Sequence, residues 1–481
     1  MRFDLVKNSD GSMRSAYPLG GYTPPGGGGD NYDYSSFPVT HIVDPTTSTN
    51  GTGSEASPLT VAQAMALNPV SAHVHCEWMP GIKSVDLLNS KWPAIRPDHS
   101  GSATYPIIHR ACNPAVTTAL QADRTRFVRN SGHGSYFGVG IDLQAFDYVT
   151  WDGFESLEYC QQDFGDEFVF SVWGQLQSTI TSNIALRRCI IENGGGGTGS
   201  DNHGCVWAQT VHDFEIGDCQ IGNNTNGYNN ENASAIMFYD VDGVDIHHSE
   251  VYDSDGLIWF KGRHAGETVR NNRVRLSILR GGSKFGLGFS SPNGGTTMAD
   301  LLRAFQNHIH TCGSGVWCNS YGAGDPLGVA IINNLIRACT SGFLMKPGAG
   351  GYAPILTNRN NILYQNTYGV QSEDTTWAAS HSMFEYNYNN YFGNTNIYRE
   401  GGNNRDWAYW TGTIGNEANG INTDPNFVNA GGGDYRLATG SNALDAGLDY
   451  LQLRGGAQSA AINLGPYISA AQDEVIGVRT A

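Results

Sequence analysis

The sequence predicts an all-β solenoid whose chain winds in parallel coils. Three observations lead to this fold class: ladders of similar residues that recur about once per coil, short segments of apolar/polar alternation, and an unusual composition. Gly accounts for 62 of the 481 residues, and charged residues for only 15%. This composition is typical of a turn-rich β protein, because Gly and Asn tolerate the positive φ angles of tight corners.

Two ladders define the expected coils. Members of the first are each followed two residues later by Ile, Val, Leu or Phe, and the second ladder lies five residues further on. Successive steps of 30, 30, 23, 35, 27, 27 and 29 residues suit parallel coils with loops of varying length. The first ladder is Cys189, Cys219, Ser249, Asn272, Asn307, Asn334, Asn361 and Asn390, and the second is Gly194, Asn224, Ser254, Ser277, Cys312, Cys339 and Asn366. Stacked Asn amides can bond to each other, so a buried polar ladder finds partners at every coil.

The ends of the solenoid are expected to differ from its body. A helix N-capped by Thr60, with an apolar face that includes Ala64 and Met65, would cover the first open end of the core. The predicted organisation is a flexible Gly/Pro-rich leader (1–37), an N-terminal cap with the first coils (38–145), a parallel β-helix body with a groove (146–400) and an irregular C-terminal cap (401–481).

Charge, hydropathy and cysteine content limit the classes of protein to which the chain can belong. The formal net charge of −17 argues against general binding to nucleic acid or membrane surfaces. The sequence has no run of 18 apolar residues, and its N-terminus lacks the apolar region of a secretory signal. The nine cysteines are expected to be reduced and buried, although the stacked pairs Cys189–Cys219 and Cys312–Cys339 would permit a bond.

Two terminal segments carry a family resemblance. Ser57-Pro58-Leu59-Thr60 and the ending Asp424-Pro425-Asn426-Phe427, with Asp434-Tyr435-Arg436-Leu437, Ser441 and Asp445-Ala446-Gly447, are similar to the entry and ending of pectate-lyase-like proteins. Over residues 38 to 470 the chain resembles this superfamily of right-handed parallel β-helices. The resemblance implies a polysaccharide lyase, a glycosidase or a phage tailspike depolymerase. It also implies an extracellular or virion-associated protein, either a monomer or a homotrimer.

A third column of residues, seven positions beyond the second ladder, is expected to face outward. Its members are Asp201, Glu231, Lys261, Lys284, Asn319, Lys346 and Glu373. The segment from Lys261 to Lys284 holds seven basic residues and one acid, whereas the remaining 457 residues hold 21 basic and 44 acidic ones. This basic island predicts an anion-binding groove. The alternative is that its arginines are solvated charges balanced by acids of nearby loops.

Such a groove would suit an anionic polysaccharide as its ligand. Uronic-acid chains are cleaved by β-elimination, which needs a cation or Ca²⁺ at the carboxylate, a base and a proton donor. A lysine among other cations could act as the base. The predicted catalytic residues are Lys261, Arg263, His264 and Tyr321, with the choice of base left open, and the predicted substrate-binding residues are Lys284, Asn319, Lys346, Arg280, Trp259 and Glu231. Lys261 could equally be a surface lysine, and His264 a turn residue.

Acidic residues offer competing chemistry. Asp240, Asp242, Asp253 and Asp255 could bind Ca²⁺, and two of the carboxylates around them, Asp245 included, could serve a glycoside hydrolase. Each alone is also a common corner residue. A third possibility is a non-catalytic carbohydrate-binding or viral attachment protein.

Overall fold

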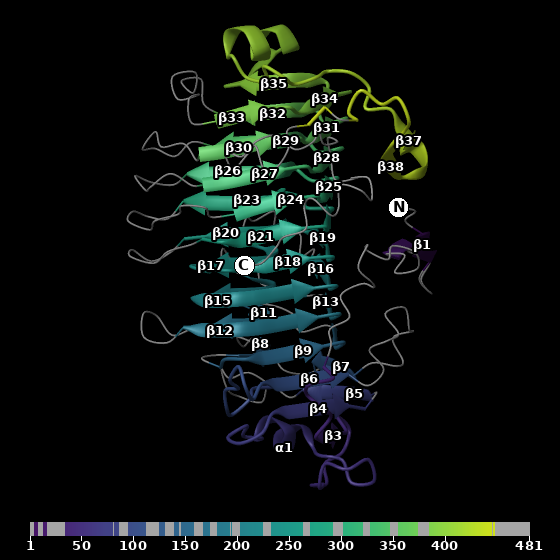
Figure 1. The fold of residues 1–481 in the computed structure, drawn as a ribbon, viewed down its shortest axis with the longest axis vertical. Helices are drawn as coiled ribbons and strands as arrows, with labels where there is room; N and C mark the ends of the chain where they lie inside the picture. Colours follow the sequence, from purple (N-terminus) through teal and green to yellow (C-terminus); the bar gives the residue numbers. More distant parts are fainter. Residues whose placement is uncertain are drawn as a thin grey trace.

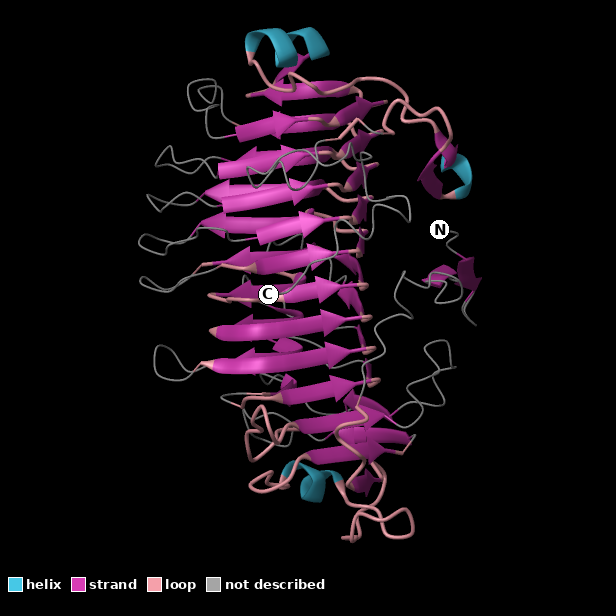
Figure 2. Cartoon of the chain, in the orientation of Figure 1, coloured by secondary structure: helices cyan, strands magenta, loops and turns pink. Residues whose placement is uncertain are grey.

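The computed structural model describes most of the solenoid. The described residues are 4–7, 13–16, 34–79, 81–85, 95–111, 125–129, 139–143, 146–157, 167–173, 180–192, 194, 203–224, 232–262, 270–291, 302–320, 328–346, 355–373, 384–444, 446 and 447. Almost all regular structure in them is β-strand, and the strands stack in three long parallel sheets along one axis (Figures 1 and 2). The predicted parallel β-helix is therefore confirmed. Among the described residues, no helix has the length and apolar character needed to cross a membrane.

In the described chain, each coil from Ile107 to Glu400 contributes one strand to each sheet. Sheet I contains β3 (His41–Val43), β4 (Val74–Trp78), β6 (Ile107–Ala111), β9 (Val149–Asp152), β12 (Thr181–Arg187), β15 (Val211–Gly217), β18 (Asp245–His247), β21 (Asn272–Arg275), β24 (Leu302–Phe305), β27 (Gly328–Ile332), β30 (Ile355–Arg359) and β33 (Phe384–Asn387).

Sheet II contains β5 (Gly81–Val85), β7 (Thr125–Arg129), β10 (Glu155–Leu157), β13 (Ile190–Glu192), β16 (Gln220–Asn224), β19 (Glu250–Ser254), β22 (Ile278–Arg280), β25 (His308–His310), β28 (Leu335–Arg337), β31 (Ile362–Tyr364) and β34 (Asn390–Phe392). Sheet III contains β8 (Val139–Asp142), β11 (Glu167–Trp173), β14 (His203–Gln209), β17 (Ser234–Tyr239), β20 (Gly256–Lys261), β23 (Phe285–Ser291), β26 (Ser314–Ser320), β29 (Ser341–Lys346), β32 (Tyr368–Ser372), β35 (Asn396–Glu400) and β36 (Asn403–Arg405).

The N-terminal end of the core is covered by α1 (Val61–Met65), as predicted. The Thr60 side chain accepts a hydrogen bond from the Gln63 backbone, and the Gln63 side chain bonds back to the Thr60 backbone, which completes a capping box. Ala64 and Met65 are buried in the solenoid core. A helix of one turn has little stability of its own, so this packing and the capping box hold it in place.

The C-terminal end is covered in two ways. The helix η3 (Tyr409–Thr413) buries Trp410 against Tyr398, with ring centroids 4.7 Å apart. The hairpin of β37 (Phe427–Asn429) and β38 (Asp434–Leu437), which lies beside the 3-10 helix η4 (Ala430–Gly432), packs Tyr435 on the outer face of sheet II. There the Arg337 guanidinium lies 4.4 Å from the Tyr435 ring centroid. Near the N-terminus, β1 (Asp4–Lys7) and β2 (Met13–Ala16) pair antiparallel.

The inward ladders are more regular than the sequence predicted. The hydrogen bonds place Ser277, rather than Asn272, after Ser249 in the first ladder, and Asn389, rather than Asn390, after Asn361. Asn272 is a buried residue of sheet I, whose amide bonds to the backbone of Val241 and Val244. The corrected first ladder is Cys189, Cys219, Ser249, Ser277, Asn307, Asn334, Asn361 and Asn389.

A left-handed corner explains this regularity. The residue before every member of the corrected first ladder has a positive φ. The first of these residues is Arg188 (φ 52°) and the last is Tyr388 (φ 59°). The second ladder shows the same feature, with Asn223, Asp253, Gly281, Thr311, Ala338, Gln365 and Gly393 at its corners. Ser277 was therefore assigned to the wrong ladder. In the second ladder, the residue that follows Ser254 is Gly282. The strands of sheet II from β16 to β34 each lie between two such corners.

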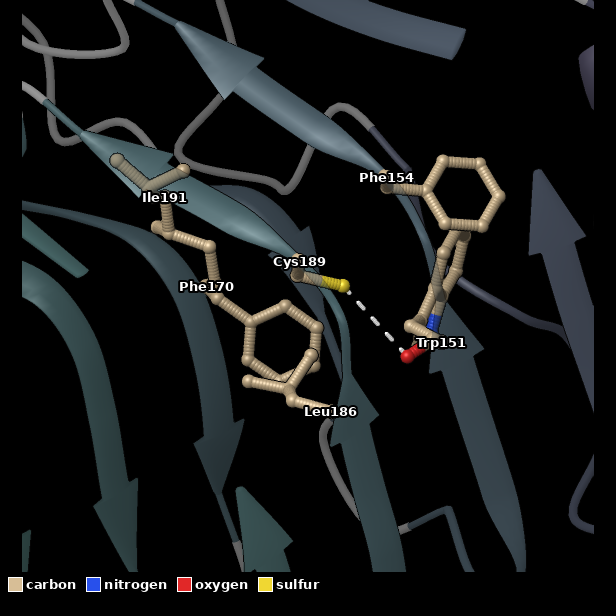
Figure 3. A pocket seen from close by; sticks show the side chains of 7 residues that line it. Trp151, Phe154, Phe170, Leu186, Cys189 and Ile191 are labelled. Atoms are coloured by element: carbon tan, nitrogen blue, oxygen red, sulfur yellow. Dashed lines mark hydrogen bonds between the residues drawn. The ribbon is translucent and has the colours of Figure 1, made fainter. Parts of the chain in front are cut away.

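Buried thiols pack within the ladders. Every cysteine of the described chain is a free thiol, and all of these are buried, as predicted. The Cys189 Sγ lies 3.6 Å from the Trp151 carbonyl oxygen beside a small apolar void, which Phe170, Leu186 and Ile191 also line (Figure 3). Burial raises the pKa of Cys219 well above its ordinary value. These thiols therefore act as small apolar side chains and not as nucleophiles.

A buried acid ends the first ladder. The Glu417 carboxylate accepts hydrogen bonds from the Asn389 backbone and side-chain amides at 3.1 and 2.6 Å, and from the Tyr391 hydroxyl at 2.9 Å. Burial raises the pKa of Glu417 to about 7, although the bonds from Asn389 and Tyr391 oppose that rise. The carboxyl is thus the last acceptor of the ladder, in a site that resists its ionisation.

We expect Glu417 to make stability depend on pH. Its folded-state pKa lies above the unfolded value, so its contribution is complete below pH 4.5 and is lost as the pH rises through 7. Between pH 4.5 and 8 the wild type should lose about 3 kcal/mol of unfolding free energy relative to Glu417→Gln. Denaturant titrations at several pH values measure this difference, with Glu55→Gln at an exposed position as the control. Parallel pH profiles for the wild type and Glu417→Gln would contradict it.

Candidate functional site on the outer face of sheet III

Aromatic side chains gather on the outer face of sheet III. Strand residues alternate between the two faces, so Ile258 and Phe260 enter the core while Trp259 and Lys261 point outward. The outward side chains form a cluster separate from the core, which we call the outer aromatic cluster. It consists of Trp207, Met237, Tyr239, Trp259, Phe285 and Trp317, with Leu344 packed against it.

A glycine makes room for the rings. Gly288 lies between Trp259 and Trp317 in the stack of strands, and a Cβ there would come within 2.7 Å of the Phe285 ring. Without that Cβ, Phe285 stacks on Trp317 with centroids 5.1 Å apart, and its centroid lies 5.7 Å from that of Trp259. The result is a continuous aromatic platform over several coils, whose rings are buried, from Phe285 at 1% exposed to Trp207 at 8%.

Lys261 lies on this platform. Its Nζ is 3.5 Å from the Trp259 ring centroid, donates to the Asn232 Oδ1 at 2.8 Å, and donates to the Tyr239 hydroxyl at 3.2 Å. Both hydrogen bonds and the cation–π contact favour the charged ammonium. The sequence did not indicate Tyr239 as a partner of Lys261. Their shared position is set by strand register, which the sequence does not display.

Register defines an outward polar column through Lys261. Lys261 pairs with Ser290, Ser290 with Asn319, and Asn319 with Lys346. The prediction that Lys261, Asn319 and Lys346 share one column is confirmed. We call Lys261, Ser290, Asn319 and Lys346 the polar column. On the two preceding coils, the same register continues through Tyr239 and Gln209.

Lys284 does not belong to the polar column, and this prediction was wrong. Lys284 precedes β23, next to Asp255, whereas Lys261 lies at the opposite, C-terminal end of β20. Ser290 lies six residue steps along the strand from Lys284, roughly 20 Å. The error follows from Ser277, because the third column was counted from that misassigned ladder member.

The middle of the column is buried and incompletely bonded. Ser290 and Asn319 are 3% and 2% exposed, and the Asn319 Nδ2 has no hydrogen-bond partner among the described residues. The Trp259 Nε1, on the same face, likewise has none within the described chain. At the end of the column, Lys346 Nζ lies 3.6 Å from a Glu373 carboxylate oxygen, and both side chains are about two-fifths exposed.

Three arginines of the predicted basic island, Arg270, Arg275 and Arg280, form ion pairs across coils. Arg270 pairs with Asp242 at 2.8 Å, and Arg275 with Asp245 at 3.0 Å. Such pairs join each arginine to an acid about one coil earlier in the chain. The alternative of balanced charges therefore holds for these arginines.

Arg280 is also excluded from the predicted groove. It lies on β22 of sheet II, not on sheet III, and pairs with Glu250 at 2.6 Å and with Asp253 at 3.2 Å. Burial would lower the pKa of Arg280, but the two carboxylates outweigh it and raise that pKa. The prediction of Arg280 as a residue of the same groove as Lys261 is wrong, because the two side chains belong to different sheets.

The four aspartates predicted for Ca²⁺ are not brought together. Asp242 bonds to Arg270 and Asn271, Asp253 to Arg280, and the Asp255 carboxylate accepts from the Ser283 hydroxyl. Asp240 is buried after β17, where its backbone amide donates to the Lys261 carbonyl. Nowhere in the described chain do three or more His, Cys, Asp or Glu side chains gather as metal ligands would.

Several predicted residues lie outside the described residues. These are Asp201, Glu231, Arg263, His264 and Tyr321. Their roles stay predictions from the sequence.

Comparison with known proteins supports the fold. The sequence matches no protein-family model, and no curated protein is similar to it in sequence. Among solved structures, the pectate lyase Pel9A is similar with a TM-score of 0.56 and 15% identity, over 90% of this chain and 97% of that chain. A rhamnogalacturonan lyase gives a TM-score of 0.43 and 12% identity over 68% and 82% of the two chains, and the Dettilon tailspike protein gives 0.36 and 12% over 69% and 60%.

The similarity to Pel9A shows a shared fold and leaves the reaction to be argued from the site. The chain has the right-handed parallel β-helix fold of the pectate-lyase-like proteins.

Proposed function

We propose that this protein is a polysaccharide lyase that cleaves an acidic, uronic-acid-containing polysaccharide by β-elimination on the outer face of sheet III. The observation that carries the proposal is the position of the Lys261 ammonium on the outer aromatic cluster. A cation held in place by an aromatic layer suits a sugar that bears a carboxylate, because the ammonium neutralises the acid while its contact with the Trp259 ring fixes its position. The similarity of fold to a pectate lyase supports the same choice.

In the proposed reaction Lys261 acts on the substrate carboxylate. Neutralising that group makes the proton at C5 more acidic and stabilises the negative charge that develops when it leaves. The C5–H bond breaks and its proton passes to a base, for which the sequence left Lys261, Arg263 and His264 open; with Lys261 on the carboxylate, we assign the base to Arg263 or His264. The electron pair forms the C4=C5 double bond, and the C4–O bond to the next sugar breaks.

The leaving oxygen takes up a proton. Tyr239 is placed to donate it, since its oxygen accepts from Lys261 at 3.2 Å and a phenol can donate its own proton at the same time. Tyr321, predicted for this role from the sequence, is the alternative donor. The described contacts favour a charged Lys261, which fits a carboxylate-binding role better than the base role.

The products distinguish elimination from other reactions. The protein is incubated with a panel of uronic-acid polysaccharides, and ultraviolet absorbance and reducing ends are followed together. Elimination should increase both, because the new double bond is conjugated with the carboxylate. New reducing ends without absorbance would show a glycoside hydrolase and contradict the proposal. The absence of both across the panel would favour a binding protein, such as a particle-attachment protein.

A further inference from the structure

We infer that the polar column selects acidic polysaccharides in which a second carboxylate lies three sugar units from the uronic acid that is cleaved. This inference rests on the proposed function and names its substrate class more closely. The inference is based on the order of residues in the column, in which the neutral Ser290 and Asn319 lie between Lys261 and Lys346.

The spacing of the column matches a sugar chain laid along the solenoid. Successive column residues lie about 4.8 Å apart, the distance between neighbouring strands. That step is comparable with the length of one pyranose unit in an extended polysaccharide. A chain that runs along the axis therefore presents one unit to each coil. Lys346 lies three coils from Lys261, roughly 14 Å, and so faces the third unit.

Each position of the column has a different chemistry. Lys261 and Lys346 bear positive charge, whereas Ser290 and Asn319 offer only neutral hydrogen-bonding groups. A carboxylate buried against Ser290 or Asn319 would lose its hydration without gaining a countercharge, which is costly. A hydroxyl-bearing unit at those two coils has no such cost. The order of charged, neutral, neutral and charged positions thus disfavours chains that carry a carboxylate on every unit.

Asn319 provides an independent sign of a missing ligand atom. Its Nδ2 is buried, with the residue 2% exposed, and has no hydrogen-bond partner among the described residues. A buried N–H group without an acceptor is unfavourable and seldom found. A hydroxyl or ring oxygen of a neutral sugar unit would supply the acceptor.

Lys346 is able to exchange its partner. Its ion pair with Glu373 spans 3.6 Å between two side chains that are 42% and 43% exposed. Exposed pairs of this kind are weak. A substrate carboxylate that reaches the Lys346 ammonium can therefore replace Glu373 as its partner.

The test uses oligosaccharides of one backbone that contain a cleavable uronic acid. A second carboxylate is placed one, two or three units away, on either side, or is reduced to an alcohol. Both kcat/KM for elimination and Kd by calorimetry are measured for the full chain. The three-unit spacing should be preferred about fivefold over the others in both quantities, the scale of one partly exposed ion pair.

Two variants and one control sharpen the result. Lys346→Gln should make kcat/KM and Kd the same for all spacings. Asn319→Lys combined with Lys346→Gln should move the preference to two units. Lys284→Gln, outside the column, should leave the wild-type preference unchanged.

Elimination without a spacing preference, or a preference that survives Lys346→Gln, would overturn the inference while the lyase proposal stands. A three-unit preference in Kd without any elimination would support the column and contradict the lyase. Neither binding nor elimination would overturn both.

Discussion

Replacing Lys261 by alanine should reduce kcat/KM for elimination by about 10³-fold. The change removes the cation that we assign to the substrate carboxylate, and electrostatic groups of this kind typically contribute 10²- to 10³-fold in rate. A factor of 10³ corresponds to about 4 kcal/mol of lost transition-state stabilisation. Initial rates of the absorbance increase, over a range of substrate concentrations, measure the effect.

Lys284→Ala is the matched control for this variant. Lys284 has the same side chain and directly precedes a strand of the same sheet, but it lies at the opposite end of the strands, where we assign it no role in the reaction. We expect its kcat/KM to stay within twofold of the wild type. Lys261→Arg keeps the charge and should retain more activity than Lys261→Ala. An alanine variant at position 261 with more than a tenth of wild-type activity would refute the assignment.

Replacing Asn361 by leucine should cost about 3–5 kcal/mol of unfolding free energy. The buried Asn361 amide accepts from the Asn334 backbone at 2.8 Å and donates to the Ile331 carbonyl at 2.8 Å and the Asn389 Oδ1 at 3.1 Å. Leucine leaves these groups unpaired inside the solenoid, at about 1–3 kcal/mol for each one that finds no other partner.

Denaturant titration measures this loss, with Asn404→Leu as the control. Asn404 is exposed on β36, so the same substitution there should change stability by less than about 0.5 kcal/mol. Equal stability of the two variants would show that the ladder amides contribute little. A loss confined to Asn361→Leu would show that the ladder bonds stabilise the fold.

The fold was predictable because its signals are local and repeated. Alternation along each strand, the Thr60 capping sequence and the recurrence of Asn and Cys all appear in the sequence. Ser277 was misassigned for a physical reason: small polar residues occupy both ladders and also the buried Asn272 position, so residue type alone does not fix the coil. The left-handed residues before each ladder position fix it, but many of them, such as Leu276 and Ala338, have no sequence signature.

The site was only partly predictable because it depends on register and ion pairs. Lys261, Asn319 and Lys346 were placed correctly, since their strands end in similar patterns. Lys284 was wrong because a count along the chain carried the ladder error with it. The arginines were misread as a groove because their acidic partners lie about 30 residues earlier, a distance at which sequence composition gives no hint of pairing.

The paired left-handed corners around sheet II have a consequence for the evolution of new specificities. Five residues separate the two ladders at every coil, so that edge of the molecule tolerates neither insertion nor deletion without shifting a strand out of register. Changes in chain length must then fall elsewhere in the coil, as they do between each strand of sheet III and the next strand of sheet I. Transplanting those connections from one parallel β-helix to another is therefore a practical route to redesign what such a protein recognises.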